Sequence, residues 1–186
     1  MVSGIGRSIK RLDNKKLLFE YLVYLLEQWK LEKHPNKTEA FTKLKLQKIL
    51  FLVASVKATN EVHTLLDVFN NFYALPYGPV EIDIYEAMNN ASFNNIRFIG
   101  NNCKHSLTDQ YFSCLDPTLM KAMNEAIQAI KELGVDYITA PPFDLVDITH
   151  KWTSWQVAMQ VAEMFGNKRE PMSTDDIINS TVKAYK

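Results

Sequence analysis

Residues 13–33, DNKKLLFEYLVYLLEQWKLEK, carry leucine and aromatic side chains at three- and four-residue spacing. The positions that recur on one helical face are Leu18, Tyr21, Leu22, Leu25 and Trp29. Asp13 is expected to cap this helix, and the His-Pro-Asn run at 34–36 to end it. The segment therefore predicts a strongly amphipathic helix, one face of which has to be covered by the rest of the chain.

Helix start and stop signals recur further along the chain. Asp116 and Pro117 form an N-cap and a first helical turn, and Gly134 follows the last apolar residue of that pattern. Ser154 and Ser173 are expected to cap two later helices. One further helix is expected at 42–58, with Thr42 as its cap, and another is expected to begin with Pro79 in its first turn. The remaining expected helices cover 117–133, 143–150, 154–166 and a closing segment after Ser173.

Extended structure is expected to be a minor component. Residues 65–75 fit either a strand or a short helix, and the asparagine-rich turns within 92–115 flank the run IRFI, which predicts a small antiparallel hairpin. The expected fold is therefore predominantly α (α+β), a compact bundle of about seven helices with a small antiparallel β element. Residues 1–12 are expected to form a flexible N-terminus, and residues 13–186 a single domain.

Composition is that of an ordinary soluble globular protein, because 47% of the residues are apolar and 23% are charged. Cys103 and Cys114 are too few for a disulfide framework. No apolar run approaches the roughly 18 residues that a membrane helix needs, and the N-terminal residues lack the apolar core of a signal peptide. We therefore expect a cytoplasmic protein that does not bind membranes.

The formal net charge of zero conceals an uneven distribution. Residues 1–60 carry twelve lysine and arginine residues against five acidic ones, whereas residues 61–165 carry five against thirteen. This division can produce one basic and one acidic face that steer charged partners, or it can reflect pairing of the two regions inside the fold. We favour internal pairing.

The sequence offers few patterns of known catalytic or metal sites. Nucleotide-binding glycine patterns and the HExxH zinc pattern do not occur. Cys103, His105 and Cys114, with His63 as a distant fourth ligand, invite a zinc site, but their spacing fits no compact zinc module. We interpret them as ordinary thiols and a turn histidine, and expect neither a metal nor another cofactor.

The stretch LVDITHKWTSW (145–155) places one histidine among possible nucleophiles. A catalytic triad would require Ser154 or Thr149 to reach His150, with Asp147 orienting the histidine. Neighbouring positions on a helix point in different directions, so these side chains do not converge easily. We therefore favour a structural role for His150, as a hydrogen-bonding residue at a helix junction.

Three stretches in this order resemble one family: LKLQKILFLVAS (44–55), FYALPYGPVEIDIY (72–85) and LVDITHKWTSWQVA (145–158). They are similar to the hallmark segments of the SocA-like Panacea antitoxin domain, also known from phage-associated proteins, and MSTDDII (172–178) resembles its terminal element. The residues at motif positions are Lys45, Gln47, Tyr77, Gly78, Pro79, Thr149, His150 and Trp155. Two departures are Leu75-Pro76, where the family has a tryptophan-containing step, and Ser154, where proline is common.

The resemblance implies a non-enzymatic binding protein. Members of the family are antitoxins that neutralise toxins encoded beside them, and the SocA-type member acts as an adaptor that delivers its toxin to a Clp-type ATP-dependent protease. The expected partner is thus a cognate toxin, with a Clp-type protease as a second one. The domain brings no known catalytic residues, so none are assigned.

Two groups of residues are candidates for this binding role. The motif residues are expected to form one polar cluster, which either specifies the fold, the role we favour, or forms the edge of a binding groove. Glu81, Asp83 and Glu86 are the expected partner surface, because many toxins that act on nucleic acid are basic. The aromatic residues Phe69, Phe72, Tyr73 and Tyr77 fit an interface and a core equally well.

A DNA-binding regulator is the alternative function. It would use the basic N-terminal helices, with Lys43, Lys45, Lys48 and Lys57 on the exposed side of the helix expected at 42–58. The neutral overall charge argues against this alternative, so no nucleic-acid partner is expected.

Overall fold

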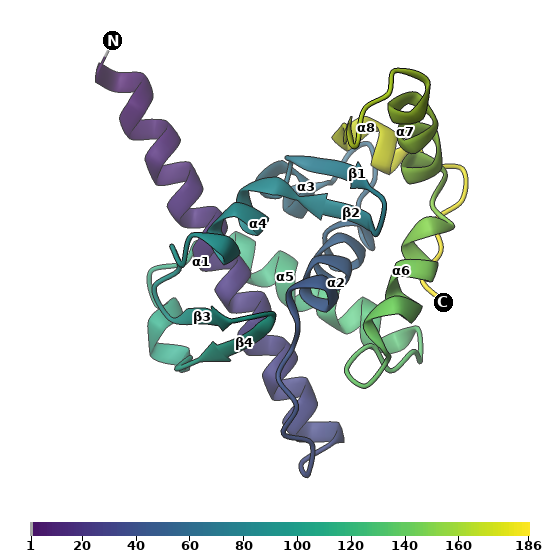
Figure 1. Cartoon of the computed structure of the whole chain (residues 1–186). Coiled ribbons are helices and arrows are strands. Elements are labelled where there is room, and N and C mark those ends of the chain that lie inside the picture. The colour runs from purple at the N-terminus through teal and green to yellow at the C-terminus, as the bar shows by residue number, and fades with distance from the viewer. Residues whose placement is uncertain (1) are drawn as a thin grey trace.

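The computed structural model describes residues 2–186, with side chains described from Leu12 onward (Figure 1). The elements in order are α1 (Val2–Lys33), α2 (Lys43–Ser55), α3 (Thr64–Val68), β1 (Phe72–Leu75), β2 (Gly78–Glu81), α4 (Ile82–Asn89), β3 (Ile96–Ile99), β4 (Asn102–His105), the 3₁₀ helix η1 (Asp109–Phe112), α5 (Pro117–Glu132), α6 (Pro142–His150), α7 (Thr153–Met164), β5 (Glu170–Met172) and α8 (Thr174–Ile178). The predominantly helical α+β fold with a small antiparallel component is confirmed.

Helix α1 is longer than the sequence pattern indicates. It extends from Val2 to Lys33, so Asp13 lies within the helix instead of at its N-cap. The flexible terminus expected at 1–12 includes Met1 and side chains that lie outside the described residues, so its flexibility stays a prediction. The single domain expected at 13–186 also stays a prediction. Among the described residues, no helix, α1 included, combines the length and the apolar character needed to cross a membrane.

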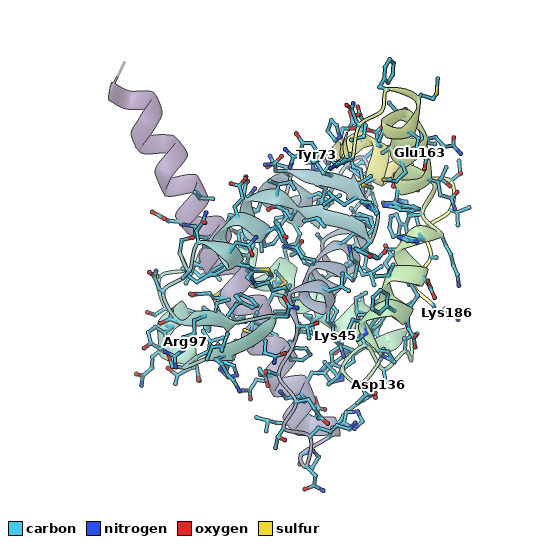
Figure 2. The ribbon with its side chains drawn as sticks, in the orientation of Figure 1. Lys45, Tyr73, Arg97, Asp136, Glu163 and Lys186 are labelled. Carbon is cyan, nitrogen blue, oxygen red and sulfur yellow. The ribbon has the colours of Figure 1, made fainter. Side chains whose placement is uncertain are left out.

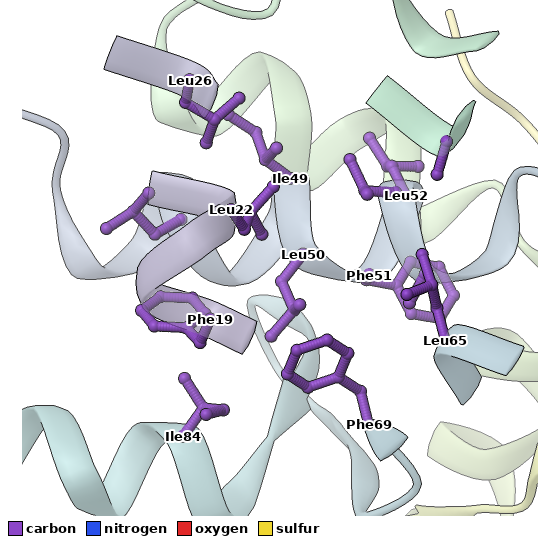
Figure 3. Packing of buried hydrophobic residues seen from close by; sticks show 14 of the residues in the cluster. Phe19, Leu22, Leu26, Ile49, Leu50, Phe51, Leu52, Leu65, Phe69 and Ile84 are labelled. Carbon is purple, nitrogen blue, oxygen red and sulfur yellow. The ribbon is translucent and has the colours of Figure 1, made fainter. Parts of the chain in front are cut away.

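Helix α2 lies at the centre of the fold. All its residues from Lys45 to Ser55 are buried, because α1, α5, α6 and strand β2 all contact it. Figure 3 shows Leu22 of α1 close to Ile49 and Leu50 of α2 within the apolar core. The apolar stripe expected on one face of this helix is therefore present, but the opposite face is covered as well.

The strands form two small antiparallel sheets. The first has the order β2-β1-β5, and β3 pairs with β4 in the second, which confirms the hairpin expected around IRFI. In the first sheet Pro76 and Tyr77 form the turn between β1 and β2, where Leu75 and Gly78 are paired. The strand interpretation of 65–75 is confirmed only for its last residues, because Thr64–Val68 is helical.

Pro79 does not begin a helix, which corrects the sequence-based prediction. It lies in β2 opposite Ala74, and an edge strand such as β2 tolerates a residue without an N–H group. Helix α4 begins three residues later, where the Glu81 carboxylate caps it by accepting a hydrogen bond from the Ile84 N–H at 2.9 Å. Pairing with β1 thus outweighs the local preference of Pro79 for a first helical turn.

The capping signals expected in the second half of the chain are confirmed in two of three cases. Asp116 accepts a hydrogen bond from the Thr118 N–H at 2.7 Å, and Ser173 forms a capping box with Asp176. Ser154, in contrast, lies inside α7, whose N-cap position is Trp152. The expected closing helix ends at Ile178, because the residues after it bind back to α7.

These contacts of the C-terminal segment are specific. The Thr153 N–H donates to the Val182 carbonyl at 3.2 Å, and the Ser154 N–H donates to Ser180 Oγ at 3.0 Å. Ser180 Oγ in turn donates to the Val182 carbonyl at 2.9 Å. The tail therefore satisfies free N–H groups at the start of α7, which a continued helix would not reach.

Candidate functional site

Residues from all three motif segments meet beside the β1–β2 turn. Lys48 of α2 is fully buried, and its Nζ donates to the Pro79 carbonyl at 2.6 Å. Gly78 has a φ of +89°, and a Cβ atom at this position would lie 2.5 Å from Thr149 Oγ1 and 3.0 Å from Lys48 Nζ. Only glycine fits this backbone conformation and this close approach. The turn is thereby held between α2 and α6.

The junction between α6 and α7 binds the same turn. The His150 ring stacks on Trp155 with a centroid distance of 3.8 Å and an interplanar angle of 10°. Trp155 Nε1 donates to the Leu75 carbonyl at 3.0 Å, and Thr149 Oγ1 donates to the Val146 carbonyl at 2.9 Å. Burial and the Lys48 ammonium lower the pKa of His150, against the opposing effects of Asp147 and the Pro76 backbone. The lowered pKa favours the neutral ring, which packs against Trp155.

Lys45 and Gln47 hold two other segments to α2. Lys45 Nζ donates to the carbonyl oxygens of Ile138 and, at 2.8 Å, Ala140; Figure 2 labels Lys45 and Asp136 in this region. Burial lowers the pKa of Lys45 to about 8. Gln47 Oε1 accepts a hydrogen bond from the Glu81 N–H at 2.9 Å. Each side chain satisfies backbone groups that would otherwise be buried without partners.

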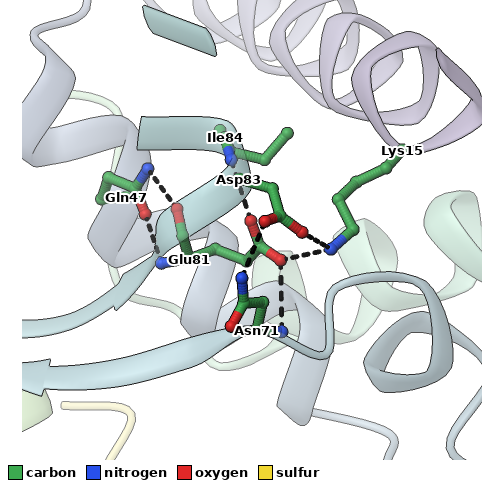
Figure 4. Close-up of polar contacts among 6 residues, drawn as sticks. All are labelled: Lys15, Gln47, Asn71, Glu81, Asp83 and Ile84. Atoms are coloured by element: carbon green, nitrogen blue, oxygen red, sulfur yellow. Dashed lines mark hydrogen bonds and ion pairs between the residues drawn. The ribbon is translucent and has the colours of Figure 1, made fainter. Parts of the chain in front are cut away.

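An ion-pair network joins α1 to the start of α4 (Figure 4). Lys15 Nζ lies 2.6 Å from Glu81 Oε1 and also pairs with Asp83. The Asn71 N–H donates to Glu81 Oε1 at 3.3 Å, and Asn71 Nδ2 donates to Asp83 Oδ1 at 2.7 Å. Burial raises the pKa of Glu81, and the Lys15 ammonium acts in the opposite direction. This contact joins the basic first third of the chain to its acidic middle, in line with internal pairing.

Because of this network, the acidic residues that were expected to form the partner surface are not all exposed. Glu81 has no exposed area, Asp83 is partly buried by its contacts with Lys15 and Asn71, and only Glu86 is well exposed. The sequence-based reasoning also missed Lys15. It lies three residues before Leu18 and seven before Leu22, so its place on the apolar stripe of α1 was the available signal.

The motif residues do not form one compact polar cluster. Gly78, Pro79 and Thr149 are in close proximity to one another and to Lys48, which is not one of the motif residues. Lys45 instead binds the 138–140 segment, and Gln47 binds Glu81. Tyr77 is 61% exposed, and its ring meets the equally exposed Phe143 edge-on at 6.0 Å.

Of the four aromatic residues with an open role, Phe69 and Phe72 belong to the core, and Tyr73 is partly buried under the Arg169 guanidinium. Only Tyr77 is largely exposed. Most motif side chains thus hold backbone segments together, and Tyr77 is the one that presents an apolar surface to the outside.

The catalytic and metal alternatives gain no support from the geometry. Within the described residues, no group of three or more histidine, cysteine and acidic side chains is placed to hold a metal ion. Cys103 is buried, which raises the pKa of its thiol to about 12, while Cys114 is exposed on another segment. Ser154 Oγ and His150 Nε2 have no hydrogen-bond partner in the described part of the chain, so they are not paired as nucleophile and base.

The DNA-binding alternative loses two of its proposed contacts. Lys45 and Lys48 are buried and donate to backbone carbonyls, so they are not on an exposed helix face as predicted. Of the four lysines, Lys43 is partly buried and Lys57 is exposed. The reason for the error is that α6 and β2, distant in the sequence, cover this face of α2.

The Lys48 amine should make stability depend on pH. Burial lowers the pKa of Lys48 to about 7 from its ordinary 10.5, so between these values the unfolded chain binds a proton that the folded chain does not. Stability then rises with pH across this window, by up to about 1.4 kcal/mol per pH unit. We expect Lys48→Met to flatten this rise between pH 7 and 8 and to reduce it above pH 8, where Lys45 still contributes because its pKa is lowered to about 8; denaturant unfolding at pH 7, 8 and 9 measures this. The exposed Lys57→Met is the matched control, and parallel curves for wild type and Lys48→Met would contradict the expectation.

The His150–Trp155 stack should contribute measurably to stability. Loss of an aromatic pair costs about 0.5–1.5 kcal/mol beyond the buried area, so His150→Ala should lower the melting temperature by roughly 2–6 °C for a chain of this size. His150→Phe keeps a ring on Trp155 and should lose much less. Calorimetry on both variants is the test, and equal losses would show that stacking is not the main contribution.

Comparisons with known proteins agree with the resemblance carried by the motifs. A family model described as Antitoxin SocA-like, Panacea domain, matches residues 46–156, which is more than half of the chain. This range contains every motif residue named above except Lys45, and it ends before the MSTDDII segment. Searches of curated proteins and of solved structures found no match. The chain therefore belongs to the SocA-like Panacea antitoxin-domain family.

Proposed function

We propose that this protein is a non-enzymatic antitoxin of the cytoplasm that binds and neutralises a toxin protein encoded nearby. The observation that supports this most is the family match over 46–156, since it covers the turn and the α6–α7 junction described above. In this proposal the buried motif residues maintain the framework, and exposed surfaces around it contact the toxin. Asp83 and Glu86 remain candidates for such a surface, and Glu81 does not.

Co-expression tests this function directly. The product of each adjacent reading frame is expressed alone and together with this protein, and growth and affinity capture are measured. We expect one neighbour that is toxic alone, harmless with this protein, and captured by it. A matched pair of variants adds specificity: Glu86→Lys should weaken capture if the α4 surface contacts the toxin, whereas Glu132→Lys on α5, also exposed, should not. If no neighbour is toxic and none is captured, the proposal is wrong.

Two routes to neutralisation are distinguishable in the same cells. Direct inhibition leaves the toxin level unchanged, whereas an adaptor that delivers the toxin to a Clp-type ATP-dependent protease lowers it. We propose measuring the half-life of the captured neighbour with this protein present, in strains with and without that protease. A half-life that shortens only when both are present would identify the adaptor route.

A further inference from the structure

A groove lies between α7, the edge strand β5 and the segment that contains α8. Its volume is about 420 Å³. One wall is apolar and is formed mainly by Val157, Ala158 and Val161 of α7, with Pro171 of β5. Apart from Thr153 to Gln156, the residues of α7 and all of those beyond it lie outside the range matched by the family model. Of the residues that line the groove, only Thr153 and Ser154 lie within the matched range.

The apolar wall continues along α7 as an exposed stripe. Val157, Val161, Met164 and Phe165 stand at positions i, i+4, i+7 and i+8, which share one helical face. Met164 and Phe165 are 80% and 74% exposed and Val157 is 53% exposed, so no described element covers them. The stripe extends for about 12 Å along the helix axis, at 1.5 Å per residue. This is the pattern that one helix offers to another.

The opposite rim of the groove is acidic. Glu170, Asp175 and Asp176 line it, and none of the lining residues is lysine, arginine or histidine. The groove thus combines an apolar wall with a formal charge of one sign. A segment that fills it well has to present apolar side chains on one face and basic side chains beside them.

One residue that lines the groove carries a buried hydroxyl without a partner. Ser154 lines the groove and is 7% exposed, and its Oγ has no hydrogen-bond partner within the described residues. Its backbone N–H, in contrast, is bound by Ser180 Oγ. Buried polar groups in folded proteins nearly always have a partner, so Ser154 Oγ is an exception. Because this oxygen is itself buried, it offers no contact to an occupant of the groove.

The edge strand β5 limits which kind of partner segment can bind in the groove. Addition of a partner strand to β5 would require backbone donors along its free edge, but Pro171 at its centre has no N–H group. A helix laid against the stripe of α7 needs no such donors. Helix docking is therefore favoured over strand addition.

We infer that this groove binds a basic amphipathic helix of a partner protein, with its apolar face on Val157 and Val161 and its basic side chains near Glu170 and Asp175. The inference rests on the proposed function in one respect, because the partner that supplies the helix is then the toxin. The groove itself can be tested without knowing that partner.

The probe is a fluorescein-labelled amphipathic helical peptide made of leucine and lysine, with a leucine–glutamate peptide of the same pattern as counterpart. Fluorescence anisotropy measures the binding of each to the full chain. We expect the lysine peptide to bind and the glutamate peptide not to bind. Absence of binding by the lysine peptide would overturn the inference.

Two variants with the same change in net charge locate the binding. Glu170→Lys with Asp175→Lys should weaken binding of the lysine peptide by about tenfold or more, a change of at least about 1.4 kcal/mol. Glu125→Lys with Glu132→Lys, on the open surface of α5, should change it by less than twofold. Equal losses in both variants would show general charge attraction and overturn the inference.

A third variant tests the apolar wall. Val157→Asp adds negative charge, so general attraction would strengthen binding, whereas docking of an apolar face predicts a loss of about tenfold. Circular dichroism on each variant establishes that the fold is retained. If a neighbour is neutralised while the groove variants bind the peptide normally, the groove assignment is wrong and the proposed antitoxin function stands. If the groove binds the lysine peptide as expected but no neighbour is neutralised, the proposed antitoxin function is wrong and the groove assignment stands.

Discussion

Replacement of Lys15 by methionine is expected to lower the free energy of unfolding by about 3–5 kcal/mol, because it leaves the buried Glu81 carboxylate without its cation. Glu81 has no exposed area and lies 2.6 Å from the Lys15 ammonium. Methionine retains most of the aliphatic length, so the loss should come mainly from the charge. Denaturant unfolding of the wild type and the variant measures it.

The pH dependence of this loss is a sharper test than its size. Without Lys15, the pKa of Glu81 should rise further, since burial already raises it and the Lys15 ammonium, together with the Ile84 N–H, opposes this. At pH values between the ordinary pKa of a glutamate and this raised pKa, Glu81 is protonated in the folded variant but ionised in the unfolded chain. Folding of the variant is therefore favoured as the pH falls through this range. The cost of Lys15→Met should therefore be largest near pH 8 and smaller near pH 5. Adding Glu81→Gln should recover part of the loss and remove its pH dependence; a constant cost would show that the charge is not the cause.

The features that sequence patterns predicted well are local ones. Asp116 and Ser173 cap their helices through bonds to residues two or three positions away, and the hairpin at 96–105 closes over a short turn. Because these interactions lie within a few residues, the signal and its effect are visible in the same window of sequence.

The features that were predicted wrongly depend on distant segments. Pro79 is a strand residue because β1 pairs with it, and Lys48 is buried because strand β2 and helix α6 cover it. The lysine pattern of α2 is typical of an exposed face, and no local property distinguishes it from a buried one. The closing helix ends early for a similar reason, since Ser180 is held by the start of α7.

The candidate site shows the same division. The motif residues were identified from the sequence, but their expected convergence into one cluster was only partly right, because Lys45 and Gln47 bind separate backbone segments. The groove beside α7 was not predicted at all. Its stripe of Val157, Val161 and Met164 resembles a core-facing stripe, and only the fold shows that Val157 and Met164 are exposed.

Gly78→Ala is expected to lower the free energy of unfolding by roughly 2–5 kcal/mol, the sum of a strained backbone and a steric conflict. The φ of +89° disfavours any residue with a Cβ, and that atom would lie 2.5 Å from Thr149 Oγ1. Gly100 provides a matched control, because its φ is +60° but a methyl group added at that position would have no other atom within 4 Å. Gly100→Ala should therefore show the backbone cost alone, at about 1–2 kcal/mol.

The difference between the two glycine variants should depend on the Thr149 hydroxyl. Thr149→Ala removes the atom nearest to the added methyl group, so the double variant Gly78→Ala, Thr149→Ala should recover part of the loss. Thr149→Ser keeps an oxygen at Oγ and should recover little. If the two double variants recover equally, the close approach is not what constrains position 78. A selective recovery would show that the turn, α2 and α6 meet here because position 78 has no side chain, which links Gly78 and Thr149 of the family motif, and the neighbouring Lys48, through contact.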